Sequence, residues 1–432
     1  MESKLKIAPS LAVAILSFAL APATPAAETT SASSVQSEFD AAMRDLDAER
    51  LRSARERLLQ LLATNPSLGR ARLELARVYY QSRDYSEARA QAQRVLDDPN
   101  TPPTVRATVL AFLAQVTADE KQQAGRHQWV PSLYAGLMYD SNVNIGPSRD
   151  VIDIGGVPFN VTPDSQETSD FAAVINPGIA HTYNPGRRFD AGEQRGFFLW
   201  QSQANAYYRA YFDENDYNLG ILTARTGPAW VVPGKWRASL GLQGDQIFLG
   251  GDSLAFYTTL NPEFTFQAGR NTEVSLSGNL SRRHYWEDDE SGRDGWYKSA
   301  DVFVSHDFNN HTMAVQFGGG WADFDADEER FSYSGPDFVV GFLWQAWRNG
   351  VVFARGNYRG YDYDGLEPLF ESSGSRDDDE WRYTLGFQHD FKGGMLRGWS
   401  LVGTFMHTDN QSNIPIYDYD RDVANLGLAR RF

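Results

Sequence analysis

The chain has 432 residues and a formal net charge of −16 at pH 7, and it contains no cysteine. This length accommodates a small domain together with a large one. Without cysteine there is no disulfide framework, thiolate metal site, cysteine nucleophile or lipid-modified cysteine. The acidic balance argues against a nucleic-acid partner, because binding to phosphates requires a basic surface.

Residues 1–27 are predicted to be a secretory signal peptide. Lys4 and Lys6 form a basic region, a mostly apolar run follows over Ile7–Ala21, and small residues precede a cleavage point within Ala23–Ala27. The alternative, a membrane anchor, is disfavoured because the apolar run is short for a bilayer and prolines follow it directly. The chain is therefore expected to be exported.

A helical repeat domain is expected over residues 38–123, after a Ser- and Thr-rich flexible lead at residues 28–37. Apolar residues in this domain recur at helical spacing, and β-branched residues are scarce. The pattern that begins at Ala54 recurs at Ala88, close to the period of tetratricopeptide repeats, and the domain resembles that family. Arg83 stands where the family usually has its turn glycine. A generic helical bundle is the alternative.

Residues 124–432 are predicted to form a transmembrane β-barrel, because long segments alternate apolar and polar residues. In one of these segments, Tyr383 and Leu385 lie on one face of the strand and Thr384 lies on the other. The segments have roughly ten to sixteen residues, about twice the length of soluble strands, so a soluble β-sandwich is the weaker alternative. We expect a membrane all-β barrel of about fourteen antiparallel strands, preceded by the small all-α tetratricopeptide-like domain.

The connections between the predicted strands differ in length. Tight turns, such as Val232–Lys235 and Arg348–Gly350, alternate with longer acidic segments, such as Asp362–Asp379. Bacterial outer-membrane barrels have short periplasmic turns and longer external loops. An even number of strands returns the chain to the side on which it entered. We therefore expect the barrel in the outer membrane and the helical domain in the periplasm.

The last predicted strand ends on an aromatic residue. Ala424, Leu426 and Leu428 share one face with Phe432. This ending resembles the signal that the barrel assembly machinery of the outer membrane reads on its substrates. Arg430, where an apolar residue is more usual, departs from that pattern. We expect Phe432 to serve as the assembly signal.

The start of the predicted barrel contains a short distinctive segment. Its candidate residues are Tyr139, Asp140, Ser141, Asn142 and Asn144. Together with the signal peptide, the helical repeats and the barrel, this segment resembles the surface lipoprotein assembly modifier (Slam) family. The resemblance implies an outer-membrane translocator that delivers specific lipoproteins, or small secreted binding proteins, to the cell surface. A turn in which Asp and Asn side chains cap the end of a strand is the simpler interpretation of the segment itself.

Eleven polar residues are predicted to face the barrel lumen, because a charged residue facing lipid would cost roughly 2–4 kcal/mol at the bilayer midplane. They are Gln201, Gln203, Asn205, Arg209, Arg237, Gln243, Arg355, Asn357, Arg359, Arg382 and Gln388. This lining of mixed charge is compatible with an open pore, a plugged pore or a translocator.

No enzyme activity, cofactor or metal site is expected. The seven histidines are scattered singly, and there is no serine elbow or histidine–aspartate signature. The expected partners are outer-membrane lipids, the barrel assembly machinery, and a client lipoprotein or secreted protein bound by the helical domain.

Two other functions compete with protein translocation. An exopolysaccharide export porin would carry more helical repeats and stacked aromatic residues in its lumen. A passive diffusion porin has no use for a repeat domain, whereas repeat domains offer binding surfaces for protein partners.

Overall fold

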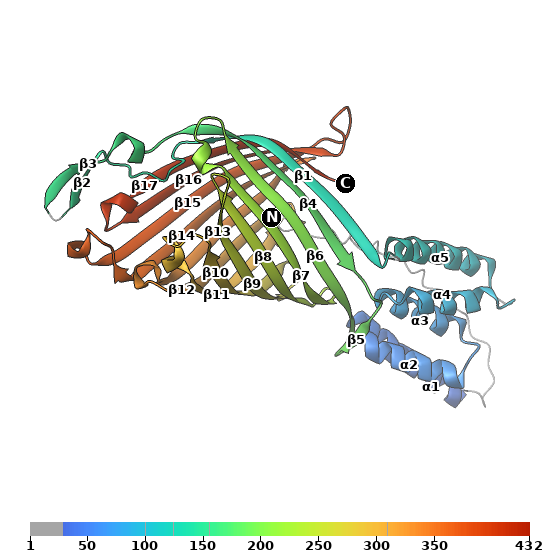
Figure 1. Cartoon of the computed structure of the whole chain (residues 1–432). Helices are drawn as coiled ribbons and strands as arrows, with labels where there is room; N and C mark the ends of the chain where they lie inside the picture. The colour runs from blue at the N-terminus through green and yellow to red at the C-terminus, as the bar shows by residue number, and fades with distance from the viewer. Residues whose placement is uncertain (1–28, 100, 124, 155, 309) are drawn as a thin grey trace. The chain divides into compact units, whose positions relative to one another are not determined.

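The computed structural model describes residues 29–432 except 100, 124, 155 and 309, so the expected signal peptide lies outside the described residues. The chain divides into a helical unit and a barrel unit, with the division after Thr117 (Figure 1). The helices are α1 (Thr29–Asp47), α2 (Leu51–Thr64), α3 (Gly69–Gln81), α4 (Tyr85–Leu96) and α5 (Pro103–Gln123), and the last of them crosses this division. Within the described residues, no helix is both long and apolar enough to cross a membrane.

The turns of the helical unit repeat with the period expected of tetratricopeptide repeats. Glu49, between α1 and α2, and Arg83, between α3 and α4, are 34 residues apart, and both have a positive φ, of 58° and 55°. The following amide closes each turn on an equivalent carbonyl: Arg50 donates to Asp45, and Asp84 donates to Tyr79. Each α-helical hairpin is therefore one repeat. Its turn requires a residue in the left-handed conformation, which glycine adopts most easily, but Glu49 and Arg83 occupy these positions.

Small residues allow the paired helices to approach closely. Ala54, Ala76 and Ala88 are completely buried. Ala54 and Ala88 belong to the same core cluster as Leu58 and Leu75, and Ala76 belongs to a second cluster with Val95. Alanine at these positions leaves room for the neighbouring helix while it favours helix formation. The helical unit is therefore held by an apolar core of its own.

The flexible lead expected at residues 28–37 is wrong from Thr29 onward, because these residues belong to α1. Val35 packs against the core of the helical unit, next to the buried side chains of Phe39 and Ala42. Ser and Thr are weak helix formers, but helices in proteins are stabilised mainly by packing of their apolar face. The packed face of α1 therefore extends the helix through the Ser- and Thr-rich segment.

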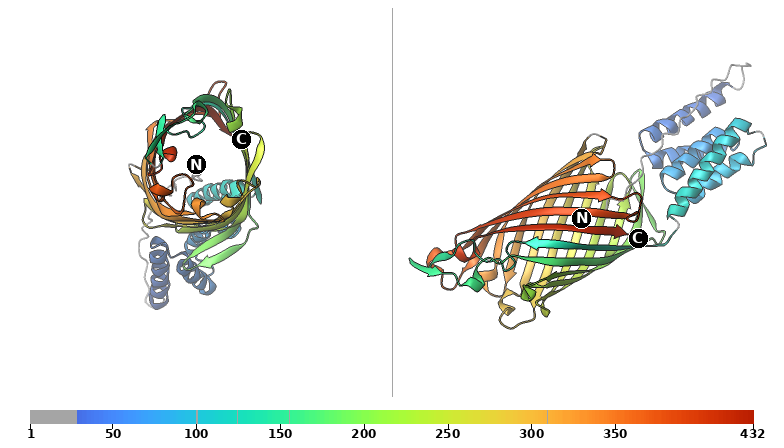
Figure 2. Two further views of the ribbon diagram at one scale, coloured as in Figure 1. Left: turned by 60° about the vertical axis from the view of Figure 1, so that its left-hand side comes forward. Right: turned by 90° about the horizontal axis from the view of Figure 1, so that it is seen from above.

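In the described part of the chain, fourteen long antiparallel strands close into a barrel (Figures 1 and 2). The strands are β1 (His127–Asp140), β4 (Asp170–Tyr183), β6 (Gln194–Tyr211), β7 (Leu219–Val232), β8 (Trp236–Leu249), β9 (Asp252–Gln267), β10 (Thr272–Tyr285), β11 (Gly295–Phe308), β12 (Met313–Ala326), β13 (Tyr333–Trp347), β14 (Gly350–Leu366), β15 (Ser375–Asp390), β16 (Trp399–Ser412) and β17 (Tyr419–Arg431). Each strand pairs with its neighbours in the barrel, and β1 pairs with β17 to close the ring. The predicted fold class is confirmed.

Two short elements extend the connections of the barrel. The hairpin of β2 (Val151–Ile154) and β3 (Val157–Asn160) lies in the connection between β1 and β4. Strand β5 (Arg188–Ala191) pairs with the first residues of β6. We call the end of the barrel that carries β2 and β3 the long-loop end, and the opposite end, where β1 begins and β17 ends, the short-turn end.

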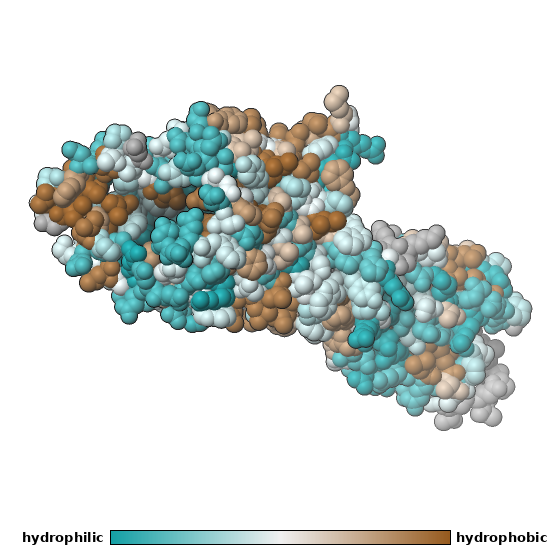
Figure 3. All heavy atoms as spheres, in the orientation of Figure 1, coloured by the Kyte–Doolittle hydropathy of each residue, from teal (hydrophilic) through white to brown (hydrophobic). Residues whose placement is uncertain are grey.

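The outer wall of the barrel carries large apolar side chains. Leu222, Leu242, Phe317 and Leu385 each expose more than half of their surface. Figure 3 shows such residues on the barrel wall and at the long-loop end, near β2 and β3. A wall of this kind suits contact with lipid, since lipid-facing and lumen-facing residues alternate along barrel strands.

Candidate functional site

The eleven predicted lumen residues lie on the face of their strands opposite the large exposed apolar side chains. They come from four strands, β6, β8, β14 and β15. Cross-strand pairing places Arg359 opposite Glu380, and Asn357 opposite Arg382. The structure therefore collects these residues into two polar groups, one on β6–β8 and the other on β14–β15.

Carboxylates partner several arginines of this inner face. Arg359 donates from Nε to the Asp337 carboxylate over 2.5 Å. Arg382 donates from Nη2 to Glu380 over 3.0 Å. The alternating pattern of the sequence predicts these arginines on the inner face, but it does not predict which carboxylates pair with them. Arginine–carboxylate pairs therefore line part of the inner wall.

Arginine–aromatic stacks on the inner wall were not predicted. The guanidinium of Arg283 lies 4.3 Å from the ring centre of Tyr297, 4.7 Å from that of Phe324 and 5.2 Å from that of Tyr257. Such contacts stabilise a desolvated cation through the negative face of each ring. Period two places these residues on the inner face, so the strand pattern could have located them.

A second stack reaches a loop at the long-loop end. The guanidinium of Arg376 lies 3.5 Å from the ring centre of Tyr417 and 4.6 Å from that of Tyr363, and it pairs with the Asp378 carboxylate. Burial and the nearby Glu367 carboxylate raise the pKa of Tyr417. The loop between β16 and β17 is therefore attached to the inner wall.

Three loops share a small apolar core at the long-loop end. Ile152 of β2, Phe370 between β14 and β15, and Ile414 between β16 and β17 are all buried in one cluster. Their burial fixes these loops against one another, because buried apolar groups resist separation into water. The long loops of β1, β14 and β16 thus form one structured cap over their sector of the rim.

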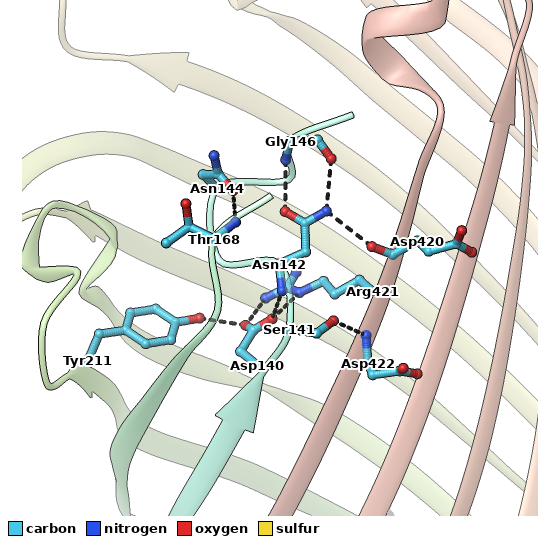
Figure 4. Close-up of polar contacts among 10 residues, drawn as sticks. All are labelled: Asp140, Ser141, Asn142, Asn144, Gly146, Thr168, Tyr211, Asp420, Arg421 and Asp422. Atoms are coloured by element: carbon cyan, nitrogen blue, oxygen red, sulfur yellow. Dashed lines mark hydrogen bonds and ion pairs between the residues drawn. The ribbon is translucent and has the colours of Figure 1, made fainter. Parts of the chain in front are cut away.

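The distinctive segment at the end of β1 lies where the barrel closes (Figure 4). Asp140 is completely buried, and its carboxylate accepts hydrogen bonds from Arg421 Nε over 2.9 Å and from the Tyr211 hydroxyl over 2.6 Å. Arg421 lies on β17 and Tyr211 on β6, so this carboxylate joins the first strand to the last one and to a strand beyond its own neighbour β4. The Asp140 and Tyr211 side chains meet although β4 lies between their strands. They can do so only on the concave, inner face of the barrel, so Asp140 points into the barrel.

Ser141 and Asn142 continue the pairing with β17 past the end of β1. The amide of Ser141 donates to the carbonyl of Asp422 over 2.9 Å, and its hydroxyl accepts from the amide of Asp422 over 2.8 Å. The buried Asn142 side chain donates to the carbonyls of Asp420 and Gly146, over 3.1 and 2.8 Å. We call this group, with the Asp140–Arg421 ion pair, the seam clamp.

The other two residues of the segment have different roles: Asn144 holds the following loop, and Tyr139 faces outward. The Asn144 side chain donates to the carbonyl of Gln166 over 2.7 Å and accepts from the amide of Thr168 over 3.1 Å. This fixes the two ends of the loop between β1 and β4. Tyr139 faces the opposite side and contacts the ring of Phe171. All five predicted residues therefore have structural contacts at the end of β1, and three of them, Asp140, Ser141 and Asn142, join it to β17.

Phe432 lies at the short-turn end of the same seam. Its amide donates to the carbonyl of Pro131 over 2.9 Å, and the residue is 60% exposed. The guanidinium of Arg430 lies over the rings of Trp399 and Phe432. Arg430, which departs from the expected pattern, thus stacks on aromatic rings. Phe432 at the end of the strand remains exposed.

No group of metal-binding side chains occurs within the described residues.

The helical unit matches a known family, whereas the barrel has only distant structural likeness. Residues 45–111 match the tetratricopeptide repeat family model. No curated protein matches the chain significantly. Together with the helical hairpins, the family match shows a tetratricopeptide-like domain joined to a barrel.

Solved structures similar to the chain include barrels from Pseudomonas aeruginosa. The outer membrane protein OprD is 7% identical, with a TM-score of 0.38 over 71% of this chain and 93% of OprD. OpdK with vanillate is 11% identical, with a TM-score of 0.37 over 71% of this chain and 98% of OpdK. The fold described above rests on the strand pairing itself.

Proposed function

We propose that this protein is an outer-membrane translocator that delivers specific lipoproteins or small secreted binding proteins to the cell surface. The observation that carries the proposal is the direct fusion of a tetratricopeptide-like domain to a closed barrel with a polar inner wall. Only residues 124–126 connect α5 to β1. The helical domain is therefore tethered to the short-turn end, which in this proposal faces the periplasm.

The width of the barrel supports a recruiting role for the helical domain. Barrel diameter grows with strand number, and porins with an aqueous channel have about 16–18 strands. A barrel of fourteen strands with arginine–carboxylate pairs on its inner wall would admit an extended chain more readily than a folded client. A client-binding domain that is tethered to the barrel by a short connection would keep the client in a form that can pass.

The test compares surface proteins of cells that carry the full protein or a form without residues 29–123. Protease treatment of intact cells reports which proteins are exposed. The proposal expects that one or a few client proteins lose exposure while the truncated barrel still assembles. Replacement of residues 29–123 by an unrelated helical domain of similar length is the matched control, and it should not restore exposure. Equal exposure in all strains would refute the recruiting role.

Export of a polysaccharide is the second candidate, and the inner tyrosines favour it. The ring of Tyr333 lies 5.1 Å from that of Tyr361 and 5.4 Å from that of Tyr363. These aromatic groups suit a sugar conduit, because flat apolar rings pack against sugar faces. In the same cells, loss of surface polysaccharide with unchanged surface proteins would favour export of glycan over translocation of protein.

A further inference from the structure

A cavity of about 310 Å³ lies on the inner wall of the barrel, beside the seam clamp. Its lining includes Arg209 of β6, Arg382 of β15 and Arg421 of β17. Strands β6 and β15 are separated along the wall by β4, β1, β17 and β16, so the cavity spans the closure of the barrel. Its volume falls within the range of small-molecule sites.

The three guanidinium groups are not equally neutralised. Arg421 pairs with Asp140, and Arg382 pairs with Glu380. Among the described residues, Arg209 forms no ion pair; its guanidinium instead lies over the ring of Tyr211, 4.7 Å from the centre. The lining arginines and their two carboxylate partners thus leave one positive charge at the cavity.

Two of these arginines also have donors without an acceptor. The Nε groups of Arg209 and Arg382 are buried, and neither has a hydrogen-bond partner. A buried donor without a partner is costly, and most such groups in proteins are satisfied. A ligand with anionic oxygens in the cavity would balance the unpaired charge of Arg209.

The other lining residues indicate which chemical groups the ligand carries. Tyr207, Thr408 and Asn425 offer neutral polar groups, while Met138 and Val423 offer an apolar surface. We propose that this cavity binds the carboxylate of a small organic anion, with Arg209 as its charged anchor and the apolar residues against its hydrocarbon part. This proposal does not rest on the proposed translocation of proteins. The carboxylate belongs either to a free organic acid or to a polypeptide chain that passes through the barrel.

The test uses the full-length protein in detergent at low ionic strength, with benzoate as the probe and benzamide as its uncharged match. Calorimetry should detect benzoate and not benzamide. Arg209→Gln should weaken benzoate binding about tenfold or more, because a charge-assisted pair is lost. Arg355→Gln is the matched control, since Arg355 is an exposed inner-wall arginine that does not line the cavity, and it should leave binding unchanged.

A second variant and a second ligand complete the test. Arg209→Lys keeps the charge but loses the planar pair of donors, so it should weaken benzoate binding less than Arg209→Gln does. If the barrel of the Arg209→Gln variant does not assemble, the Arg209→Lys variant still tests the role of Arg209. A short apolar peptide with a free terminal carboxylate, compared with its amide, distinguishes a chain in transit from a free acid. Equal binding of benzoate and benzamide, absence of benzoate binding, or unchanged binding in both Arg209 variants would overturn the proposal.

Discussion

The carboxylate of Asp140 and the guanidinium of Arg421 form a buried ion pair across the first and last strands of the barrel. The side chain of Asp140 is fully buried, and that of Arg421 is 18% exposed. The pair lies where the barrel is least extensively joined, because β1 and β17 share nine paired positions whereas β1 and β4 share fourteen. Side-chain bonds of the seam clamp thus supplement a short backbone ladder.

Replacement of Asp140 by Asn should destabilise the folded barrel. The change leaves the largely buried Arg421 side chain without its counter-charge, and removal of one partner of a buried ion pair typically costs about 3–5 kcal/mol. The temperature at which the folded form disappears, followed by gel mobility of samples heated to increasing temperatures, should fall clearly.

Asp422→Asn is the matched control for the seam clamp. Its carboxylate is 46% exposed and contacts His407 on the outer wall, so its loss should change stability by less than about 1 kcal/mol. Arg421→Gln combined with Asp140→Asn should be less destabilising than the sum of the two single changes, because the residues interact directly. A strictly additive result would contradict the proposed coupling.

The helical unit should fold alone only when α1 is complete. A fragment of residues 29–123 is expected to show a helical circular dichroism spectrum and cooperative thermal unfolding, because the unit has its own buried core. A fragment that begins at residue 38 loses Val35 from the surface of that core. It should unfold at a lower temperature, and equal stability of the two fragments would show that the start of α1 contributes nothing.

The turn residues Glu49 and Arg83 are expected to limit the stability of the helical unit. A left-handed conformation costs a residue with a side chain roughly 1–2 kcal/mol, whereas glycine adopts it freely. Arg83→Gly should therefore raise the free energy of unfolding of the fragment by about 1 kcal/mol in a denaturant titration, after the greater flexibility of unfolded glycine is subtracted.

Arg94→Gly provides the contrast within the same repeat. Arg94 is an exposed residue in the last turn of α4, where glycine removes a good helix former and a cation that stabilises the helix C-terminus, at a cost of about 1 kcal/mol. The two glycine substitutions should thus shift stability in opposite directions. If Arg83→Gly destabilises the fragment as Arg94→Gly does, the positive φ at that turn is not a source of strain.

The sequence predicts those parts of this fold that depend on local periodicity. Alternation in strands of 13 to 18 residues identifies the barrel and places residues such as Gln203 and Arg382 on one face. The seam clamp is different, since Asn142 bonds to a carbonyl 278 positions away. Nothing local marks such a contact. The helical start at Thr29 was likewise hidden, because it depends on the packing of Val35 and not on propensity.

Two carboxyl groups of the helical unit should give stability opposite dependences on pH. Hydrogen bonds from Arg50, and then from Arg57, lower the pKa of Asp45 below its ordinary value of 3.8. Its contribution to stability is present above pH 3.8 and is lost as the pH falls through the lowered value. Asp45→Asn should therefore destabilise the fragment at pH 7, and the difference from the unmodified fragment should shrink in acid.

Glu74 should behave in the opposite way. Burial raises its pKa above the ordinary value of 4.5, and its Oε2 atom has no hydrogen-bond partner although Arg77 lies 3.6 Å away. The folded state therefore binds the proton more tightly than the unfolded state does. Its contribution is fully present below pH 4.5 and is lost as the pH rises through the raised value. Glu74→Gln should consequently stabilise the fragment at pH 7, with a gain that decreases as the pH is lowered. Denaturant titrations at about pH 2.5, pH 4 and pH 7 measure both variants. A gain for Glu74→Gln that does not change between pH 4 and pH 7 would show that folding does not raise the pKa of this carboxyl group.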